Sequence, residues 1–317
     1  MTKQYLIYEV TPRCNYNCLY CYNVWKADNK YPPGELAIKE VKHLFNKVLV
    51  DIHLEWIILS GGEPLLHKNI YEIIKFLKEK NQRIGIATNG SLLKIDNVHK
   101  LIEDGIGYFE ISLNSTNVDN YKRLCRSDSL KKVKNAILLV KKKKIPLTVS
   151  FTVTRINLND IEKVIDLCYA FSVDAIALNR FVPGGEGIEN KEELTISKKG
   201  LESVLKIANE KSSKHKIPIN ITIPIEDCEI KHAQYPRLNF GTCGCGESKW
   251  VIDPVGNLRT CEQNPEILGN LLEKSFTELS QMKAVKDFRN NNINEKCHDC
   301  GYIKNCGGGC RFVDKLA

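Results

Sequence analysis

From residue 4 to residue 179, short apolar runs alternate with amphipathic segments. The runs resemble strands in their β-branched and aromatic content, and they lie at residues 5–10, 55–59, 83–87, 108–113, 147–153 and 174–178. Between them, residues 70–77 and 161–168 place apolar side chains at the 3.6-residue period of a helix. Strands that alternate with helices predict βα units and a parallel sheet. Six such units predict an α/β fold, a partial (β/α)6 TIM-like barrel.

The alternation stops at residues 183–187, Pro-Gly-Gly-Glu-Gly, where we expect the barrel to end. Beyond this point we expect a helix with Ser197 as its N-cap, and then an extended run at residues 217–224. The composition changes again near Cys243, where glycine and cysteine become frequent. We therefore predict three regions: a barrel over residues 1–182, a connecting region over 183–240, and a small Cys-rich α+β module over 241–317.

Local signals sharpen this outline. Asn159 with Glu162, and Ser275 with Glu278, have the spacing of capping boxes at the start of helices. Residues 249–261 alternate apolar and polar side chains around a Pro/Gly turn, which predicts a β-hairpin.

Composition places the chain among ordinary globular proteins, with one exception, its 13 cysteines. The first eight residues lack the pattern of a secretory signal, and no apolar run is long enough to span a membrane. We therefore expect a cytoplasmic protein with reduced thiols, whose clustered cysteines are metal ligands rather than disulfides. The net charge of +8 sits largely in lysines at residues 131–134 and 141–144, interleaved with apolar positions at helical spacing. This pattern indicates the solvated face of a helix rather than a nucleic-acid site.

The loop after the first predicted strand carries Cys14, Cys18 and Cys21, with Tyr20 before the last of them. Three thiolates at this spacing can ligate three irons of a [4Fe–4S] cluster and leave the fourth iron open, since such clusters normally take four cysteines. The alternative is a zinc knuckle, which needs a fourth Cys or His nearby. None lies between residues 9 and 42 apart from these three.

Polar or glycine-rich residues follow the next strands. The second ends in Gly61, Gly62 and Glu63, where glycines allow the backbone to approach a ligand closely and the glutamate is an acceptor suited to an ammonium group. In isolation this motif is also compatible with a simple strand-to-helix turn. The same reasoning marks residues at the ends of the third, fourth and sixth strands: Asn89, Ser112, Asn114 and Asn179.

The three-Cys loop and Gly-Gly-Glu-Pro together resemble the radical S-adenosylmethionine (SAM) enzymes. The resemblance implies that the amino and carboxylate groups of S-adenosyl-L-methionine chelate the open iron, and that Gly61, Gly62 and Glu63 bind its amino group. Residues 121–127 resemble the segment whose arginine reaches the SAM carboxylate, which selects Arg126, although an exposed helical arginine is the alternative. Asn179 is implied as a neighbour of the adenosine.

The C-terminal cysteines, including the run Cys-x2-Cys-x5-Cys-x3-Cys, resemble the SPASM extension of peptide- and protein-modifying radical SAM enzymes. Carried over to this chain, the resemblance implies one or two auxiliary iron–sulfur clusters. The first would use Cys243, Cys245, Cys261 and Cys310. The second would use Cys297, Cys300 and Cys306.

Two departures from the SPASM pattern matter. Cys243 and Cys245 are closer in sequence than usual, so one of them could be idle. The late cysteine that normally completes the second cluster is absent, which leaves an open iron or a ligand such as His298, Asp299 or Asp314. One or two structural zinc sites are the alternative for this whole field.

Three cysteines remain outside these sets. Cys168 lies on an apolar helical stripe and is expected in the core, and Cys125 adjoins Arg126. Cys228 precedes the cluster field and is a candidate hydrogen donor to a substrate radical, with an inert loop thiol as the alternative.

The implied reaction is reductive cleavage of SAM to a 5′-deoxyadenosyl radical, which abstracts a hydrogen from a peptide or protein during crosslinking, oxidation or epimerisation. The implied electron donor is reduced ferredoxin or flavodoxin. Because the first strand begins at about residue 5, we expect no leader-binding domain before it, and a separate carrier protein could present the substrate.

Other functions stay open at this point. A small molecule, such as a tetrapyrrole side chain, is an alternative substrate for the same chemistry. From a different class, the chain could be a multi-cluster electron carrier or a zinc-stabilised binding protein without SAM chemistry.

Overall fold

A single sheet runs through the computed structural model, which describes residues 3–27, 31–291, 293 and 295–312. Its eleven strands in the described residues follow the order β11-β10-β9-β1-β2-β3-β4-β5-β6-β7-β8. The strands are β1 (Tyr5–Thr11), β2 (Trp56–Gly61), β3 (Ile84–Thr88), β4 (Ile106–Ser112), β5 (Leu147–Val153), β6 (Ala175–Arg180), β7 (Ile219–Ile221), β8 (Leu238–Phe240), β9 (Lys249–Ile252), β10 (Asn257–Arg259) and β11 (Gly269–Asn270).

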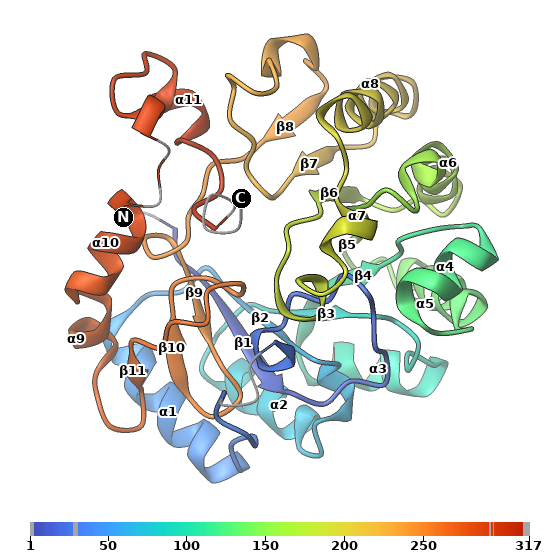
Figure 1. Ribbon diagram of the computed structural model, residues 1–317. Coiled ribbons are helices and arrows are strands. Elements are labelled where there is room, and N and C mark those ends of the chain that lie inside the picture. The colour runs from blue at the N-terminus through green and yellow to red at the C-terminus, as the bar shows by residue number, and fades with distance from the viewer. Residues whose placement is uncertain (1–2, 28–30, 292, 294, 313–317) are drawn as a thin grey trace.

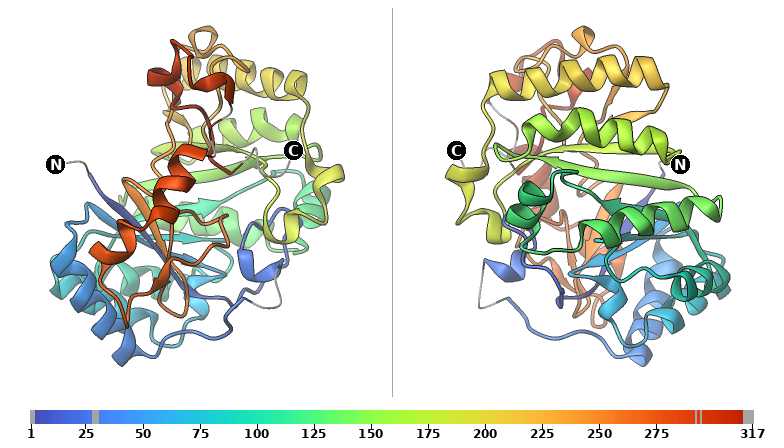
Figure 2. Two further views of the ribbon diagram at one scale, coloured as in Figure 1. Left: turned by 60° about the vertical axis from the view of Figure 1, so that its left-hand side comes forward. Right: turned by 90° about the vertical axis from the view of Figure 1, so that its right-hand side faces the viewer.

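Helices cover the outer face of the curved sheet, as Figure 1 shows. The longer ones are α1 (Ile38–Asp51), α2 (Ile70–Glu79), α3 (Ile95–Asp104), α4 (Val118–Cys125), α5 (Leu130–Lys142), α6 (Ile161–Ala170), α8 (Lys198–His215) and α10 (Lys283–Asn291). Three short helices complete the set: α7 (Lys191–Leu194), α9 (Phe276–Ser280) and α11 (Ile303–Cys306). In the right-hand view of Figure 2, α5, α6 and α8 lie one above another on this face.

The six predicted strands all form, and they pair in parallel in chain order. β5 has the predicted ends, and each end of the other five strands lies within two residues of the predicted one. The sheet is buried on both faces, which is why these strands read as nearly continuous apolar runs. The α/β fold with a partial barrel is thus confirmed, and Figure 1 shows the C-terminal strands β9, β10 and β11 on the β1 side of the sheet.

The sheet extends farther than the sequence predicted. On one side, β7 and β8 continue it in parallel beyond β6, past the expected end at residue 182. On the other side, β9 pairs in parallel with β1, and β10 pairs with β9 as the predicted hairpin. Because one sheet passes through all three predicted regions, their boundaries stay a prediction.

Two of the three predicted helix caps form. The Ser197 and Ser275 side chains accept hydrogen bonds from the Gly200 and Glu278 N–H groups at 3.2 and 3.1 Å. The predicted capping box at Asn159 is wrong, because this residue lies in a 3₁₀ turn and α6 begins after Asp160 without a side-chain cap.

The lysine-rich segment forms α5, whose Val133, Ile137 and Val140 are buried while Lys131 and Lys132 are exposed, as predicted for a solvated helix face. Among the described residues, no helix has both the length and the apolar character needed to cross a bilayer. The cytoplasmic location stays a prediction.

Candidate active site

A cavity of about 430 Å³ lies inside the barrel and opens at the carboxyl ends of its strands. Enzymes of the barrel class place their functional residues at this end. The two cysteine fields meet here, although they are more than 200 residues apart in the chain. The cysteines that line the cavity are Cys14, Cys18, Cys21, Cys125, Cys243, Cys245, Cys261 and Cys310.

The loop after β1 holds the first three of these cysteines in a tight turn. The Cys21 N–H donates to the Cys18 carbonyl at 3.2 Å, and the Tyr16 N–H donates to Cys14 Sγ at 3.4 Å. Burial raises the pKa of the Cys14 and Cys21 thiols to about 11, so metal binding here must release protons.

The spacing of these sulfurs tests which metal centre fits. The Sγ atoms of Cys14, Cys18 and Cys21 are not all within 4.8 Å of one another. A single tetrahedral zinc ion, with Zn–S bonds of about 2.3 Å, would draw its thiolates to roughly 3.8 Å from each other. The three sulfurs thus lack the close grouping that a single zinc ion needs.

Gly61 and Gly62 bring the next loop against the cysteine loop. A Cβ atom on Gly61, whose φ is +120°, would lie 2.5 Å from the Thr11 carbonyl oxygen, and one on Gly62 would lie 2.1 Å from that of Arg13. The N–H groups of Gly62 and Glu63 donate to these same carbonyls at 2.8 Å. Both glycines line the cavity. The Gly62 N–H group already donates to the Thr11 carbonyl and is therefore not free for a ligand.

Glu63 does not line the cavity, and its predicted contact with an ammonium group stays a prediction. Its carboxylate is buried and accepts hydrogen bonds from the Thr88 hydroxyl and from the N–H groups of Asn89 and Leu65, at 2.8, 2.9 and 3.2 Å. Burial raises the pKa of Glu63 to about 7, against the effect of these donors. Glu63 therefore joins the loops after β2 and β3 and positions both.

Four other predicted cofactor contacts do line the cavity: Tyr20, Asn89, Ser112 and Asn179. The Asn89 amide donates to Asn15 Oδ1 at 2.9 Å, and the Asn179 amide donates to Ser150 Oγ at 3.1 Å. These bonds fix the orientation of both amides at the mouth of the barrel. Whether these side chains touch SAM stays a prediction.

Asn114 and Arg126, the two other predicted SAM contacts, lie outside the cavity lining, and their contact with SAM stays a prediction. Asn114 is buried behind Tyr20, donates to its hydroxyl at 2.5 Å and accepts from the Thr152 N–H at 2.6 Å. Arg126 ends α4 with a side chain 43% exposed, and its guanidinium pairs with Glu186 at 3.0 Å. The alternative from the sequence, an exposed arginine at the end of a helix, fits Arg126 better.

An Arg126→Ala variant tests whether Arg126 binds SAM. We expect the Kd for SAM to stay within about twofold, whereas losing a charge-assisted hydrogen bond to the SAM carboxylate would cost about 2 kcal/mol, a factor of about 30. Calorimetric titration of the anaerobically reconstituted chain measures the difference. Arg123→Ala is the matched control, because Arg123 is also exposed and pairs with Glu193. A tenfold or larger loss of affinity confined to Arg126→Ala would support the contact that the sequence predicted.

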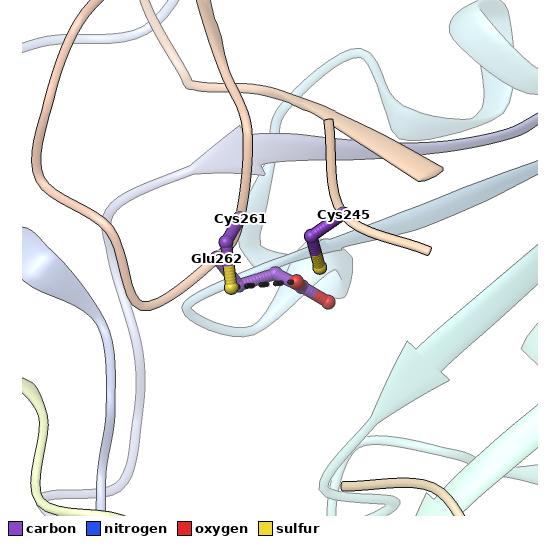
Figure 3. Close-up of side chains that lie close together, drawn as sticks. All are labelled: Cys245, Cys261 and Glu262. Atoms are coloured by element: carbon purple, nitrogen blue, oxygen red, sulfur yellow. Dashed lines mark hydrogen bonds between the residues drawn. The ribbon is translucent and has the colours of Figure 1, made fainter. Parts of the chain in front are cut away.

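The second cysteine field forms the opposite wall of the cavity. Cys243, Cys245, Cys261 and Cys310 all line it, and whether both Cys243 and Cys245 are ligands stays open. Figure 3 shows Cys245 facing Cys261 and Glu262, three side chains whose ligand atoms lie within 4.8 Å of one another. The Glu262 carboxylate is already paired with Lys249 Nζ at 2.8 Å. Cys243, Cys245, Cys261 and Cys310 stay the predicted ligands of the first auxiliary cluster.

Hydrogen bonds favour the thiolate form of Cys243. Its pKa is lowered to about 5, chiefly by a hydrogen bond from the Cys245 thiol and then by the backbone N–H groups of Cys245 and Arg311, against the effect of burial. Arg289, on α10, donates to the Cys243 carbonyl at 2.7 Å and holds the loop in place. A thiolate that hydrogen bonds stabilise in this way is suited to binding iron.

Arg259, at the end of β10, ties this wall to the first strand. It is completely buried, forms a close ion pair with Glu9 of β1, and donates to the carbonyls of Cys261, Glu262 and Asn264 at 3.3, 3.0 and 3.1 Å. One side chain thus fixes the loop that carries Cys261 relative to the strand that leads into the Cys14 loop.

Cys297, Cys300 and Cys306 lie outside the cavity lining. The Cys300 N–H donates to the Cys297 carbonyl at 3.2 Å, the same turn that joins Cys18 to Cys21. Of the proposed fourth ligands, His298 and Asp299 are exposed, and Asp314 lies outside the described residues. Cys228 is exposed too and does not line the cavity, so its position does not favour the predicted role of hydrogen donor.

Sequence reasoning missed several polar residues that point into the barrel. Ser60, Glu110, Ser150 and Thr152 line the cavity from β2, β4 and β5. A signal was present, because a fully buried parallel strand reads as a continuous apolar run, and polar residues at alternate positions share one face. Ser150 and Thr152 have this spacing within β5.

Comparison with known proteins agrees with this geometry. Residues 8–168 match the sequence profile of the Radical SAM superfamily, and residues 243–301 match that of SPASM, an iron–sulfur cluster-binding domain. The chain is 28% identical to an AdoMet-dependent heme synthase of Methanosarcina barkeri, over 96% of this chain and 90% of that protein. It is 24% identical to a PqqA peptide cyclase of Granulibacter bethesdensis, over 96% and 82%.

Among solved structures, SuiB of Streptococcus suis bound to S-adenosylmethionine superposes with a TM-score of 0.75 at 17% identity, covering 98% of this chain and 73% of that one. This likeness shows the shared fold. The cofactors of such proteins are SAM and iron–sulfur clusters, which suits the cysteine-lined cavity. The chain therefore belongs to the radical SAM enzyme superfamily, with a C-terminal SPASM iron–sulfur module.

Proposed function

We propose that the chain modifies a peptide or protein by removing a hydrogen atom from one of its carbon atoms. The observation that carries this proposal is that the basic side chains lining the cavity already form ion pairs or hydrogen bonds within the protein. The three are Arg180, Lys249 and Arg311, and each has an acidic or carbonyl partner.

Cys14, Cys18 and Cys21 would hold the N-terminal cluster, and the cluster together with SAM would supply the radical chemistry when bound. The chain's own residues bind and orient. Ser112, Asn89 and Asn179, at the strand ends, offer polar groups to SAM, and Tyr20 is held beside them by Asn114. A substrate carbon must be held within about 3–3.5 Å of the reacting atom, so selectivity depends on how the cavity wall positions the substrate.

The charge of the wall favours a peptide over a polyanion. Lys249 pairs with Glu262 at 2.8 Å, and Arg180 lies 3.6 Å from Glu226 and donates to the Pro224 carbonyl at 2.8 Å. Of the Arg180 and Lys249 side chains, only Arg180 has a buried donor without a partner, its Nε–H group. One donor can serve a peptide carbonyl or a single carboxylate, whereas a tetrapyrrole brings several carboxylates that each need a cation.

Peptide-modifying proteins among the similar ones support this choice. One relative is named a PqqA peptide cyclase, and SuiB has also been solved with its precursor peptide SuiA. For this chain we further propose reduced ferredoxin or flavodoxin as electron donor, and a carrier protein that presents the substrate.

A tetrapyrrole is the second candidate substrate. It is favoured by relatives that match nearly the whole chain, the heme synthase and a pre-heme d1 synthase of Dinoroseobacter shibae. In this case the cavity would have to open the Arg180–Glu226 or Lys249–Glu262 pair to bind the substrate carboxylates.

Isotope transfer separates the two candidates. The reconstituted chain is given SAM, dithionite and either iron-coproporphyrin or perdeuterated peptides encoded by short reading frames beside its gene. We expect deuterium from one peptide to appear in 5′-deoxyadenosine, together with a change in the mass of that peptide. Loss of carbon dioxide from the porphyrin, with all peptides unchanged, would contradict the proposal in favour of a tetrapyrrole substrate.

A further inference from the structure

The predicted second set of C-terminal cysteines, Cys297, Cys300 and Cys306, offers three thiolates, whereas an iron–sulfur cluster normally takes four cysteines. We propose that Cys228, from the loop after β7, is a fourth ligand of this site. Cys228 lies about 70 residues upstream of Cys297 in the sequence.

Contacts on both sides of Cys228 hold its loop against the cysteine segment. On one side, Glu226 packs so closely on Gly309 that a Cβ atom there would lie 2.1 Å from Glu226 Oε1. On the other side, Lys231 Nζ lies 5.0 Å from the ring centroid of Tyr302. Cys228 lies between these two contacts in sequence, and its partners flank Cys306.

The loop that carries Cys228 is itself a fixed turn. The N–H groups of Glu229 and Ile230 both donate to the Glu226 carbonyl at 3.0 Å, and the Ile225 and Ile230 side chains are buried. The Asp227 carboxylate accepts from the His232 N–H at 3.0 Å. These bonds anchor the ends of the turn and leave the Cys228 thiol exposed at its crest.

Cys297 lies against the same glycine segment. A Cβ atom on Gly308 would lie 3.8 Å from Cys297 Cβ, and Gly309, the next residue, packs against Glu226 of the loop that carries Cys228. This loop therefore meets the segment at which Cys297 and Cys306 come together.

The chemistry of the donor set suits an iron–sulfur cluster, because four cysteines are the ligands that such a cluster normally takes. Glu226 lies on the same loop as Cys228, but its carboxylate lies 3.6 Å from the Arg180 guanidinium. The soft thiolate of Cys228 is the better iron ligand.

Iron content gives the first test. The full-length chain and its Cys228→Ala variant are reconstituted anaerobically with iron and sulfide, and both elements are counted per chain. We expect Cys228→Ala to lose about one to four irons, since a cubane holds four, and to match Cys300→Ala. Cys168→Ala is the control, because Cys168 is buried in the core and should keep the full count. Full iron and sulfide in Cys228→Ala would overturn the proposal.

A second test needs no variant to fold. Iodoacetamide labelling of the unmodified chain, mapped by mass spectrometry, compares the reconstituted and the iron-free forms. Because a ligated thiolate is not free to react, we expect Cys228 to be alkylated at least about tenfold more slowly in the reconstituted form. Equal labelling of Cys228 in both forms would refute its role as a ligand. Neither test depends on the substrate, so its failure would leave the proposed function intact.

Discussion

Replacing Cys18 with alanine is expected to abolish cleavage of SAM to 5′-deoxyadenosine. Only Cys14, Cys18 and Cys21 in this loop offer thiolates to the N-terminal cluster, and two ligands cannot hold a cubane in place. Iron should fall by about four per chain, the content of one cubane. The auxiliary iron should remain, because its ligands lie in other segments. Product chromatography and iron analysis of the anaerobically reconstituted protein measure both effects.

Cys125 provides the matched control. It lines the same cavity, its carbonyl accepts from the Cys18 thiol at 3.8 Å, and its own thiol lies 3.6 Å from the Tyr20 hydroxyl. If the fourth iron is open to SAM, Cys125→Ala keeps both the cluster and the cleavage activity. Loss of the cluster in Cys125→Ala would identify a fourth protein ligand, and activity in Cys18→Ala would place the reaction elsewhere.

Arg259→Met is expected to lower the free energy of unfolding by about 3–5 kcal/mol, because it leaves the Glu9 carboxylate buried without its partner. The change also removes the donor to the carbonyls of Cys261, Glu262 and Asn264. We therefore expect a loss of auxiliary iron as well. Anaerobic urea unfolding and iron analysis of the same preparation give the two measurements.

A double-mutant cycle with Glu9→Gln isolates the ion pair from these other bonds. The two side chains are in contact, so we expect their coupling energy to exceed about 1 kcal/mol. Exposed pairs such as Lys3–Glu55 contribute only about 0–1 kcal/mol, and Lys3→Ala is a suitable reference. A coupling near zero would mean that Arg259 acts through the carbonyls alone.

The strands of the barrel could be predicted because a largely buried strand appears in the sequence as a run of apolar residues. β5 was found with its exact ends, 147–153, since all its residues but one are buried. β7 and β8 have only three residues each, too few to show any period, so their place in the sheet depends on long-range pairing. The pairing of β9 with β1, about 240 residues apart, is equally invisible to local patterns.

The cysteine positions of the site could be predicted, but the direction of several side chains could not. A motif fixes where Glu63, Asn114 and Arg126 stand in the chain, not which neighbours they meet. Glu63 accepts hydrogen bonds from three donors outside the cavity lining. Asn114 donates to the Tyr20 hydroxyl, and Arg126 donates to Glu186 at the surface. In each case a tertiary partner decides the direction, and the motif does not include that partner.

The same limit applies to Cys228. Its sequence neighbours say nothing about the C-terminal cysteines, and its loop meets them only through the packing of Glu226 on Gly309 and of Lys231 on Tyr302.

The central claim is that the N-terminal cluster has an open iron that SAM chelates. Electron–nuclear double resonance on the reduced chain, with SAM carrying ¹⁷O in its carboxylate and ¹⁵N in its amino group, tests it most directly. The account predicts hyperfine coupling to both labels in the unmodified chain and in Cys125→Ala, and none in Cys18→Ala. A cluster signal in the unmodified chain that is unchanged by SAM and shows no coupling to either label would contradict it.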